Sequence, residues 1–261
     1  AKTLTALDPD KVGRLCPAAR LITKALAGSP RKQSADSNLR HGFGDKMESE
    51  LGFLGYGAMS RDISQRLADS GIIPFDRQIV SGRDRAKLDQ AAWEKGLTVA
   101  DNNKDLARRC QTVVLGVKPA QVIGVMDEIR DYFHGGLVIS LAAGVTLEAM
   151  GSHVSPQAGL VRSMPNVAAL AGGGTTLICA PPETDEAQVE KARDIFESVG
   201  ICLNLPEHLF DAAGAVSGSV QAYFFEIMAN PVRVAVRLGL PWAEARRLVI
   251  NTALGSALLV T

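Results

Sequence analysis

The sequence predicts an α/β fold, in which helices cover both faces of a mainly parallel sheet and an all-helical C-terminal domain follows. From residue 47 onward, apolar runs of strand length alternate with segments of helical spacing. This alternation is typical of a parallel sheet with right-handed crossovers. The first strand ends in two glycines at the start of a helix. From residue 210 the chain is rich in small residues at helical spacing, which predicts closely packed helices in a second domain.

The first strand and helix contain the most informative segment, residues 51–60. Gly55 permits a tight turn, and Gly57 lets the backbone approach a pyrophosphate at the N-terminus of the next helix. Ser60 holds the third position of the G-x-G-x-x-G/A pattern, where a small side chain allows close packing. The alternative is an ordinary glycine-rich turn, but the strand before it and the helix after it favour a Rossmann-type dinucleotide site. The predicted cofactor contacts of this turn are Gly55, Gly57, Ala58 and Met59.

The remaining elements follow from apolar periodicity and turn residues. Further strands are expected at residues 78–81, 97–100, 112–117, 137–141, 159–162 and 175–180. Helices are expected at residues 84–95, 104–109, 120–133 and 183–198.

The end of the second strand indicates which dinucleotide binds. A carboxylate there would accept from a ribose 2′-hydroxyl, whereas arginine accommodates a 2′-phosphate. The sequence continues with Ser81, Arg83 and Arg85, and guanidinium groups match phosphate oxygens. Asp84 is the expected N-cap of the next helix. We therefore expect NADPH, with Ser81 and Arg83 as contacts and NADH as a possible substitute. A solvated basic turn is the alternative.

Other strand ends supply further candidate contacts at the same edge of the sheet. Lys118 could contact the cofactor or an anionic substrate, although a lone lysine before proline is commonly a surface residue. The additional predicted cofactor contacts are Val117, Lys118, Pro119, Ala143, Gly144 and Asn166. The four histidines form no cluster in the sequence, and none is assigned to catalysis.

Composition excludes several classes of function. The 261-residue chain has a formal net charge of zero, which gives nucleic-acid binding no global electrostatic support. Its four cysteines are far apart and form no C-x-x-C pair, which argues against a metal site or a disulfide framework and favours a reducing compartment. No apolar run reaches the roughly 18 residues that a membrane span needs.

Residues 1–46 differ from the rest of the chain. They contain nine Lys or Arg, four Asp and no Glu. This composition resembles an organelle-targeting segment, for a mitochondrion or a plastid, with a cytoplasmic protein as the alternative. Residues 12–27 could form an amphipathic helix. We expect the extension to dock on a partner in a larger assembly, and a disordered tail is the alternative.

Several motifs occur in the order found in pyrroline-5-carboxylate reductases, and the sequence resembles that family from about residue 47 onward. They are Gly52-Phe53-Leu54-Gly55-Tyr56-Gly57-Ala58-Met59, Val117-Lys118-Pro119, Ala143-Gly144, Arg162-x-Met164-Pro165-Asn166 and Ser217-Gly218-Ser219. Asp211, Tyr223 and Glu226, and the Gly239-Leu240 and Thr252-x-x-Gly255 pairs, resemble the family's helical domain.

The resemblance implies hydride transfer from NADPH or NADH to the C=N bond of pyrroline-5-carboxylate, giving proline. It also implies a homo-oligomer, with a dinucleotide-binding domain at residues 47–206 and a helical dimerisation and substrate domain at residues 207–261. Ser217, Gly218 and Ser219 would shape the pocket for the substrate carboxylate. The catalytic residues are left open, with Lys118, Ser217 and Ser219 as candidates.

The sequence also departs from the family pattern. Val220-Gln221 replaces the usual Gly-Pro, which adds bulk at a helix entry. Pro231 is expected to interrupt a helix. A chain ending at Thr261 would have a truncated helical domain without the family's Ser-Pro-Gly-Gly turn, and we would expect negligible turnover from it. Three interpretations stay open: a working reductase, a catalytically impaired accessory subunit of a larger assembly, and a dehydrogenase for another small acid.

Overall fold

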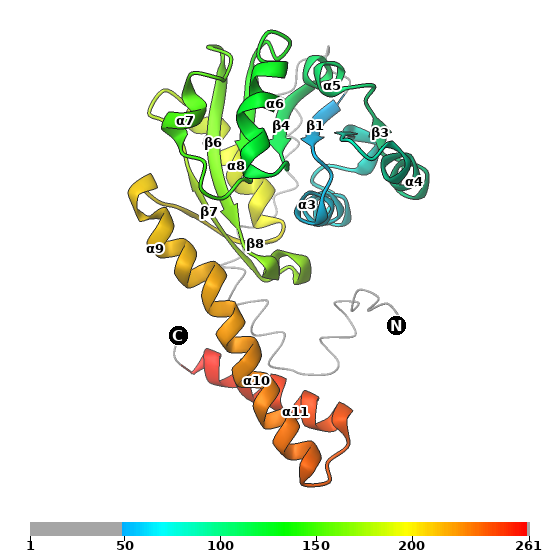
Figure 1. Ribbon diagram of the computed structural model, residues 1–261, viewed down its shortest axis with the longest axis vertical. Coiled ribbons are helices and arrows are strands. Elements are labelled where there is room, and N and C mark those ends of the chain that lie inside the picture. The colour runs from blue at the N-terminus through cyan, green and yellow to red at the C-terminus, as the bar shows by residue number, and fades with distance from the viewer. Residues whose placement is uncertain (1–48, 260–261) are drawn as a thin grey trace. The chain divides into compact units, whose positions relative to one another are not determined.

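The computed structural model describes residues 49–259, and the predictions for residues 1–46 lie outside this range (Figure 1). The described chain forms two compact units, residues 49–219 and residues 220–259, and each is considered by itself. The domain boundary predicted after residue 206 stays a prediction.

The first unit contains one eight-stranded sheet with the order β3-β2-β1-β4-β5-β6-β7-β8. Its strands are β1 (Ser49–Leu54), β2 (Gln78–Ser81), β3 (Thr98–Val99), β4 (Cys110–Leu115), β5 (Gly136–Ser140), β6 (Ala158–Pro165), β7 (Gly174–Cys179) and β8 (Gly200–Asn204). All neighbouring strands are parallel except β6 and β7, which are antiparallel. The chain therefore moves outward from β1 on one side, through β2 and β3, and returns to build the other side from β4.

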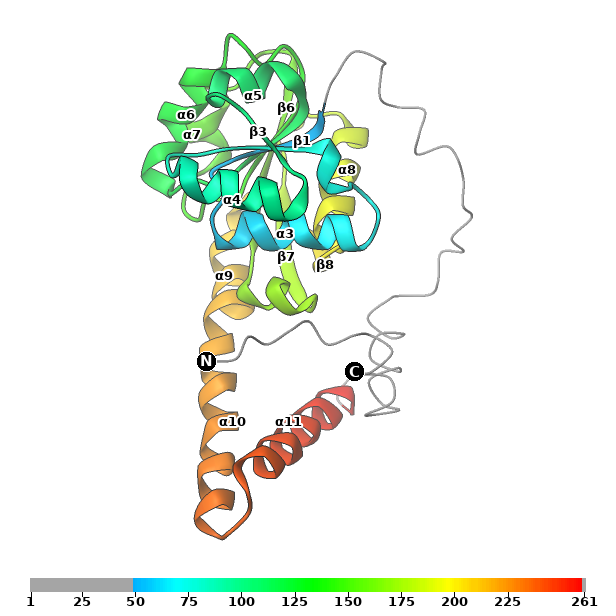
Figure 2. The same ribbon diagram turned by 90° about the vertical axis from the view of Figure 1, so that its right-hand side faces the viewer.

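Helices cover both faces of this sheet, as the sequence predicts (Figure 2). On one face, the core includes side chains from α3 (Ala58–Asp69), α4 (Arg85–Lys95) and α8 (Glu186–Glu197). On the other face, it includes side chains from α5 (Asn103–Arg109), α6 (Val122–Ile129) and α7 (Leu147–Gly151). The central strands are buried on both faces, which explains why they read as continuous apolar runs.

Short helical elements follow the sheet in the first unit. They are the 3-10 turn η5 (Glu207–Leu209), the helix α9 (Phe210–Gly214) and the π-helical turn η6 (Ala215–Ser219). Phe210 is fully buried and packs on β7 side chains in a small third core. Three more 3-10 turns lie next to strands: η2 (Phe75–Arg77) before β2, η3 (Pro119–Gln121) after β4 and η4 (Val167–Ala171) after β6.

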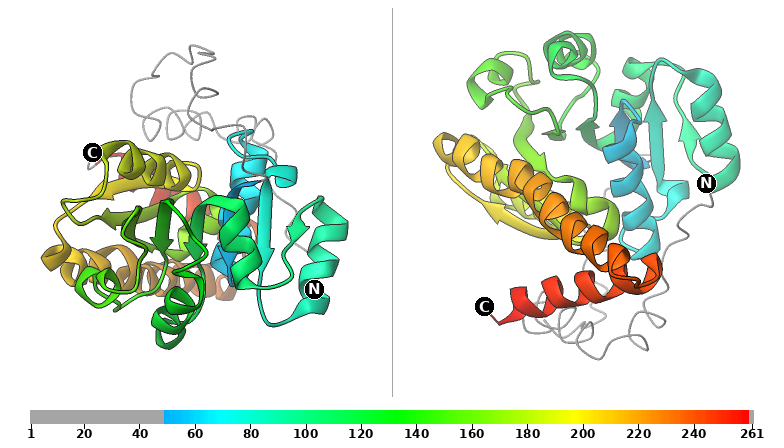
Figure 3. Two further views of the ribbon diagram at one scale, coloured as in Figure 1. Left: turned by 90° about the horizontal axis from the view of Figure 1, so that it is seen from above. Right: turned by 60° about the horizontal axis from the view of Figure 1, so that its bottom comes forward.

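The second unit is a pair of helices, α10 (Val220–Arg237) and α11 (Trp242–Leu258), joined by a short turn (Figure 3). Gly239 in this turn has a φ of 98°, a conformation that favours glycine. The expectation that Pro231 interrupts a helix is wrong, because α10 continues through it to Arg237. Proline removes one backbone donor, and the other hydrogen bonds of this 18-residue helix suffice to continue it.

Most predicted elements are confirmed, with shifted ends. The strand expected at residues 112–117 is two residues earlier, because Gly116 already belongs to the turn that follows it. The helix expected at residues 120–133 begins with the turn η3 and ends at Ile129. The sequence analysis missed β8 and the five-residue helix α7.

Candidate cofactor-binding site

A cavity of about 1220 Å³ lies where the loops after β1, β2 and β4 meet. Because the chain reverses its direction of travel across the sheet between β1 and β4, this is the topological switch point at which open α/β sheets bind ligands. Of the residues predicted to bind a cofactor, those that line the cavity are Gly55, Gly57, Ser81, Arg83, Val117 and Lys118. This lining agrees with the prediction that a cofactor binds at the carboxyl edge of the sheet.

The floor of the cavity is a close contact between two backbones. Gly55 has a φ of 90°, and its N–H donates to the Ser81 carbonyl over 2.8 Å. A Cβ at Gly55 would lie 2.9 Å from the carbonyl carbon of Gly116, and a Cβ at Gly116 would lie 2.5 Å from the Gly55 oxygen. Ser60 donates its hydroxyl to the Gly55 carbonyl over 2.8 Å. Glycine is thus required in the turns after both β1 and β4, and Ser60 stabilises the first of these turns in addition to being small.

The N-terminus of α3 opens onto this floor. Its N-cap is Gly57, which provides no side-chain hydrogen bond, and its first turn contains no acidic residue. A Cβ at Gly57 would meet nothing within 4 Å. The first backbone N–H groups of a helix lack intrahelical partners, and they attract anions together with the helix dipole. This geometry fits a pyrophosphate, as the glycine pattern predicts.

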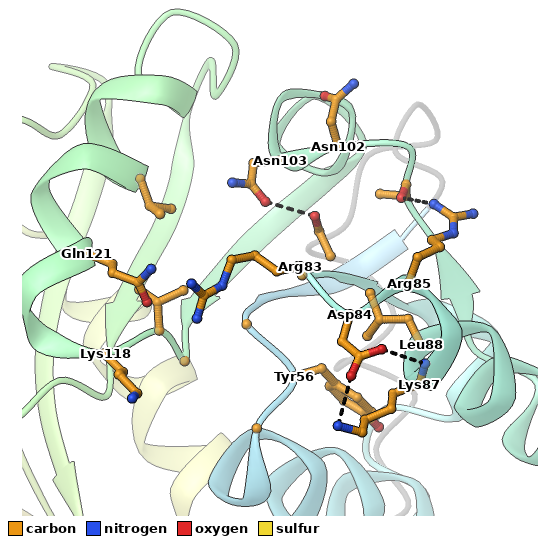
Figure 4. A pocket seen from close by; sticks show the side chains of 18 of the residues that line it. Tyr56, Arg83, Asp84, Arg85, Lys87, Leu88, Asn102, Asn103, Lys118 and Gln121 are labelled. Atoms are coloured by element: carbon orange, nitrogen blue, oxygen red, sulfur yellow. Dashed lines mark hydrogen bonds and ion pairs between the residues drawn. The ribbon is translucent and has the colours of Figure 1, made fainter.

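The loop after β2 lies at one side of the cavity (Figure 4). Arg83 is exposed and points toward Gln121 and Lys118, and within the described chain no carboxylate pairs with it. Arg85 points the other way and is engaged, since it contacts Asp89 at 3.0 Å and donates to the Ala100 carbonyl over 2.9 Å. Of these two arginines, Arg83 is therefore the one whose guanidinium is available to a ligand, and Arg61 of α3 also lines the cavity.

Two residues close to Arg83 in the sequence already have partners within the protein. Asp84 caps α4, as predicted, by accepting from the Lys87 N–H, and it pairs with the Lys87 ammonium at 2.8 Å. The hydrogen bonds from Lys87 lower the pKa of Asp84, so its charge is retained and neutralised locally. Ser81 is buried and donates its hydroxyl to Asn103 over 2.8 Å. The predicted preference for a phosphate therefore depends chiefly on Arg83.

Sequence reasoning missed several residues that line the cavity. They include Tyr56, Arg61, Asn102, Asn103, Gly116 and Gln121. Asn103 donates to Glu128 over 2.8 Å, and Asn102 is the N-cap of α5. Burial raises the pKa of Tyr56, so its phenol stays neutral at physiological pH. The N-cap signal at Asn102 is visible in the sequence, but its placement beside β2 depends on the fold.

The other predicted contacts lie outside the cavity lining. Ala58 and Met59 begin α3, Pro119 begins η3, and Ala143 and Gly144 follow β5. Their roles stay predictions.

Asn166 follows β6 and is 8% exposed. Its side-chain amide donates to the Ser217 carbonyl over 2.8 Å and accepts from the Thr175 N–H over 3.1 Å. The structure places Ser217, Gly218 and Ser219 together on the π-helical turn η6. Because Asn166 lies at the carboxyl end of β6, η6 lies at the same edge of the sheet as the cavity.

Within residues 49–259, no group of three or more His, Cys, Asp or Glu side chains could hold a metal ion. No helix of the described chain is long and apolar enough to cross a membrane.

The fold and this cavity define a dinucleotide-dependent oxidoreductase class of protein. Residues 50–144 match the family model described as "NADP oxidoreductase coenzyme F420-dependent", and residues 207–261 match "Pyrroline-5-carboxylate reductase dimerisation". Pyrroline-5-carboxylate reductase from Synechocystis is 33% identical over 82% of this chain and 80% of that protein. The chain belongs to the pyrroline-5-carboxylate reductase family, which confirms the resemblance seen in the sequence.

Solved structures support the same assignment. A pyrroline-5-carboxylate reductase from Coxiella burnetii aligns with a TM-score of 0.73 at 34% identity, covering 80% of this chain and 78% of that one. The Plasmodium falciparum enzyme, solved with NADP bound, aligns with a TM-score of 0.71 at 28% identity, covering 82% and 79%. The predicted fold class is thereby confirmed.

Proposed function

We propose that this protein reduces 1-pyrroline-5-carboxylate to proline with NADPH. The observation that carries the proposal is the glycine-floored cavity at the open N-terminus of α3, in a chain of this family. Bound there, the nicotinamide cofactor would supply a hydride for the C=N bond. The chain's own residues bind and orient the two molecules, which is the larger part of what an imine reduction needs from a protein.

Each part of the cavity would contact a different part of the cofactor. The backbone at Gly55, Gly57 and Gly116 allows the pyrophosphate to approach the first turn of α3. Arg83 would pair with a 2′-phosphate, which favours NADPH over NADH. Lys118 lines the opposite side, where its ammonium would attract an anionic group of either ligand.

The substrate carboxylate is assigned to the turn of Ser217, Gly218 and Ser219. Its hydroxyl and backbone N–H groups are of the kind that bind carboxylates. The turn is π-helical, and such turns are rare and frequent at functional sites.

Residues 220–259 are proposed to pair two copies of the chain. They carry large apolar side chains that are well exposed, including Tyr223 at 67%, Ile227 at 63% and Trp242 at 62%. A groove of about 320 Å³ between α10 and α11 is lined by Phe225 and Trp242 among others. Exposed patches of this kind mark interfaces. Trp242→Glu should convert a dimer to monomers in light scattering, whereas the exposed Glu244→Gln on the same helix should not.

A second candidate function is a catalytically impaired subunit of a larger assembly. Val220-Gln221 favours it, because these side chains directly follow the proposed substrate turn and Gln221 has a buried oxygen without a partner in the described chain. Residues 1–46, outside the described range, are proposed to provide docking and organelle targeting. Deleting them should release the chain from that assembly and leave the first unit folded.

One assay separates the two candidates. Purified protein is mixed with NADPH and 1-pyrroline-5-carboxylate, and proline is quantified by chromatography alongside the loss of absorbance at 340 nm. Proline formation in step with NADPH consumption supports the reductase. NADPH binding without proline formation supports the impaired subunit.

A further inference from the structure

Alternate residues at the end of β6 and just after it contact successive turns of the segment that follows the sheet. Arg162, Met164 and Asn166 are two positions apart, so an extended strand directs their side chains to one face. Their partners lie in residues 207–217, which contain η5, α9 and most of η6. All of these residues belong to the first unit.

The contact at Arg162 is ionic and aromatic. Its side chain is 5% exposed, and Nη1 donates to Glu207 Oε1 over 2.7 Å. The guanidinium carbon lies 4.7 Å from the centre of the Phe210 ring, within the range of a cation–π contact. The same Glu207 oxygen accepts from the Leu147 N–H over 2.7 Å. The start of the segment is thus held by three interactions.

The next two contacts are steric and polar. A Cβ at Gly214 would overlap the terminal methyl group of the flexible Met164 side chain, so the end of α9 packs directly on this residue of β6. Asn166 then donates to the Ser217 carbonyl, while its oxygen is held by Thr175 on β7. The amide orientation is therefore fixed from both sides.

The spacing of the partners matches the spacing of the strand. Phe210, Gly214 and Ser217 are four and three residues apart, about one helical turn each, or ~6 and ~4.5 Å of rise. Two residues of a strand advance by ~6–7 Å. A strand and a helical segment of these repeats can therefore stay in contact over three successive positions.

From this register we infer that Asn166 is a positioning residue for the substrate turn, acting through the Ser217 carbonyl rather than by touching the cofactor. The inference rests on the proposed function, in which Ser217–Ser219 receive the substrate carboxylate. Arg162 and Met164 fix the height of the segment along β6, and Asn166 fixes the orientation of the Ser217 peptide. Without that hydrogen bond, the backbone of η6 can change from π-helical to ordinary α-helical geometry.

The test is Asn166→Asp, which keeps the oxygen that accepts from Thr175 but removes the N–H donor to Ser217. The KM for 1-pyrroline-5-carboxylate should rise at least tenfold, while the Kd for NADPH changes less than twofold. Amide hydrogen exchange in residues 210–219 should accelerate at least tenfold, and exchange in residues 55–60 should not change. Below the pKa of the new carboxyl, its protonated form can donate again, so the KM defect should shrink as pH falls.

Asn204→Asp is the matched control, because Asn204 is an exposed asparagine of the same sheet and should leave every readout unchanged. If Asn166→Asp does not fold, Gly214→Val tests the same register, because a branched side chain there needs more room than turning the Met164 methyl aside provides, and it should raise the KM and the exchange of residues 210–219. A fall in NADPH affinity that matches the rise in KM would overturn the inference in favour of a cofactor contact. Unchanged exchange in residues 210–219 would also overturn it. Exchange needs no turnover, so a wild-type protein that forms no proline would contradict the proposed function alone.

Discussion

Replacing Arg83 with alanine should weaken NADPH binding by about tenfold or more and leave NADH binding nearly unchanged. A charge-assisted hydrogen bond to a phosphate contributes about 1.5–3 kcal/mol. Arg83 is exposed and solvent screens it, so we take the lower end, and about 1.4 kcal/mol corresponds to a factor of ten in Kd. Ser81 does not compensate for the loss, because its hydroxyl is bound to Asn103.

The measurement is a fluorescence or calorimetric titration of each cofactor, at two salt concentrations. Raising the ionic strength from 0.1 to 1 M shortens the Debye length from about 10 to about 3 Å, so the wild-type preference for NADPH should narrow. Arg85→Ala is the matched control, because Arg85 is engaged by Asp89 and the Ala100 carbonyl, and its loss should affect both cofactors alike. Equal losses for NADPH and NADH in Arg83→Ala would refute the role given to this arginine.

Three further outcomes follow from packing, charge and burial. Gly116→Ala should destabilise the fold by about 1–3 kcal/mol in urea titrations and abolish cofactor binding, since its Cβ meets the Gly55 carbonyl. If the variant bound NADPH with wild-type affinity, the close contact between Gly55 and Gly116 would not be needed for the site. Glu207→Ala should cost about 3 kcal/mol, because it leaves the buried Arg162 charge unpaired, and a change under 1 kcal/mol would count against that ion pair. Burial raises the pKa of the Cys179 and Cys202 thiols to about 12, so both should resist iodoacetamide at pH 8 until the protein unfolds. The folded pKa values exceed the unfolded value near 8.5, so the stability that the two buried thiols contribute is complete below about pH 8.5 and is lost progressively toward pH 12. Labelling of the folded protein at pH 8, or a free energy of unfolding that rises from pH 8.5 to 12, would contradict the burial of these thiols.

Local pattern was enough to predict the parts of the site that depend on neighbouring residues. Gly55 and Gly57 are recognisable because a tight turn and an open helix N-terminus need only the few residues around them. Arg83 is recognisable because it comes directly after a short apolar strand. The alternation of strands and helices likewise predicted the sheet and its two covered faces.

Local patterns do not predict contacts between residues that are far apart in the sequence. Asn103 joins the site through bonds to residues 22 and 25 positions away, and nothing in its own surroundings predicts them. The sequence predicts Asn166 as a cofactor contact at a strand end, and its hydrogen bond to Ser217, 51 residues later, is not visible in that pattern. The strand β8 was missed because two of its apolar side chains, Ile201 and Leu203, are exposed on an edge strand without a clear alternation.

The contact between Gly55 and Gly116 bears on how the site can be redesigned. The obstacle to a side chain at either position includes backbone atoms of the other, and backbone cannot be trimmed by a second substitution. A larger residue at one position therefore has no compensating partner at the other. The exposed loop that contains Arg83 is free of that restriction. A library that seeks a new cofactor preference should vary this loop and hold the two glycines constant, since selectivity can change there without disturbing the surface on which every dinucleotide would rest.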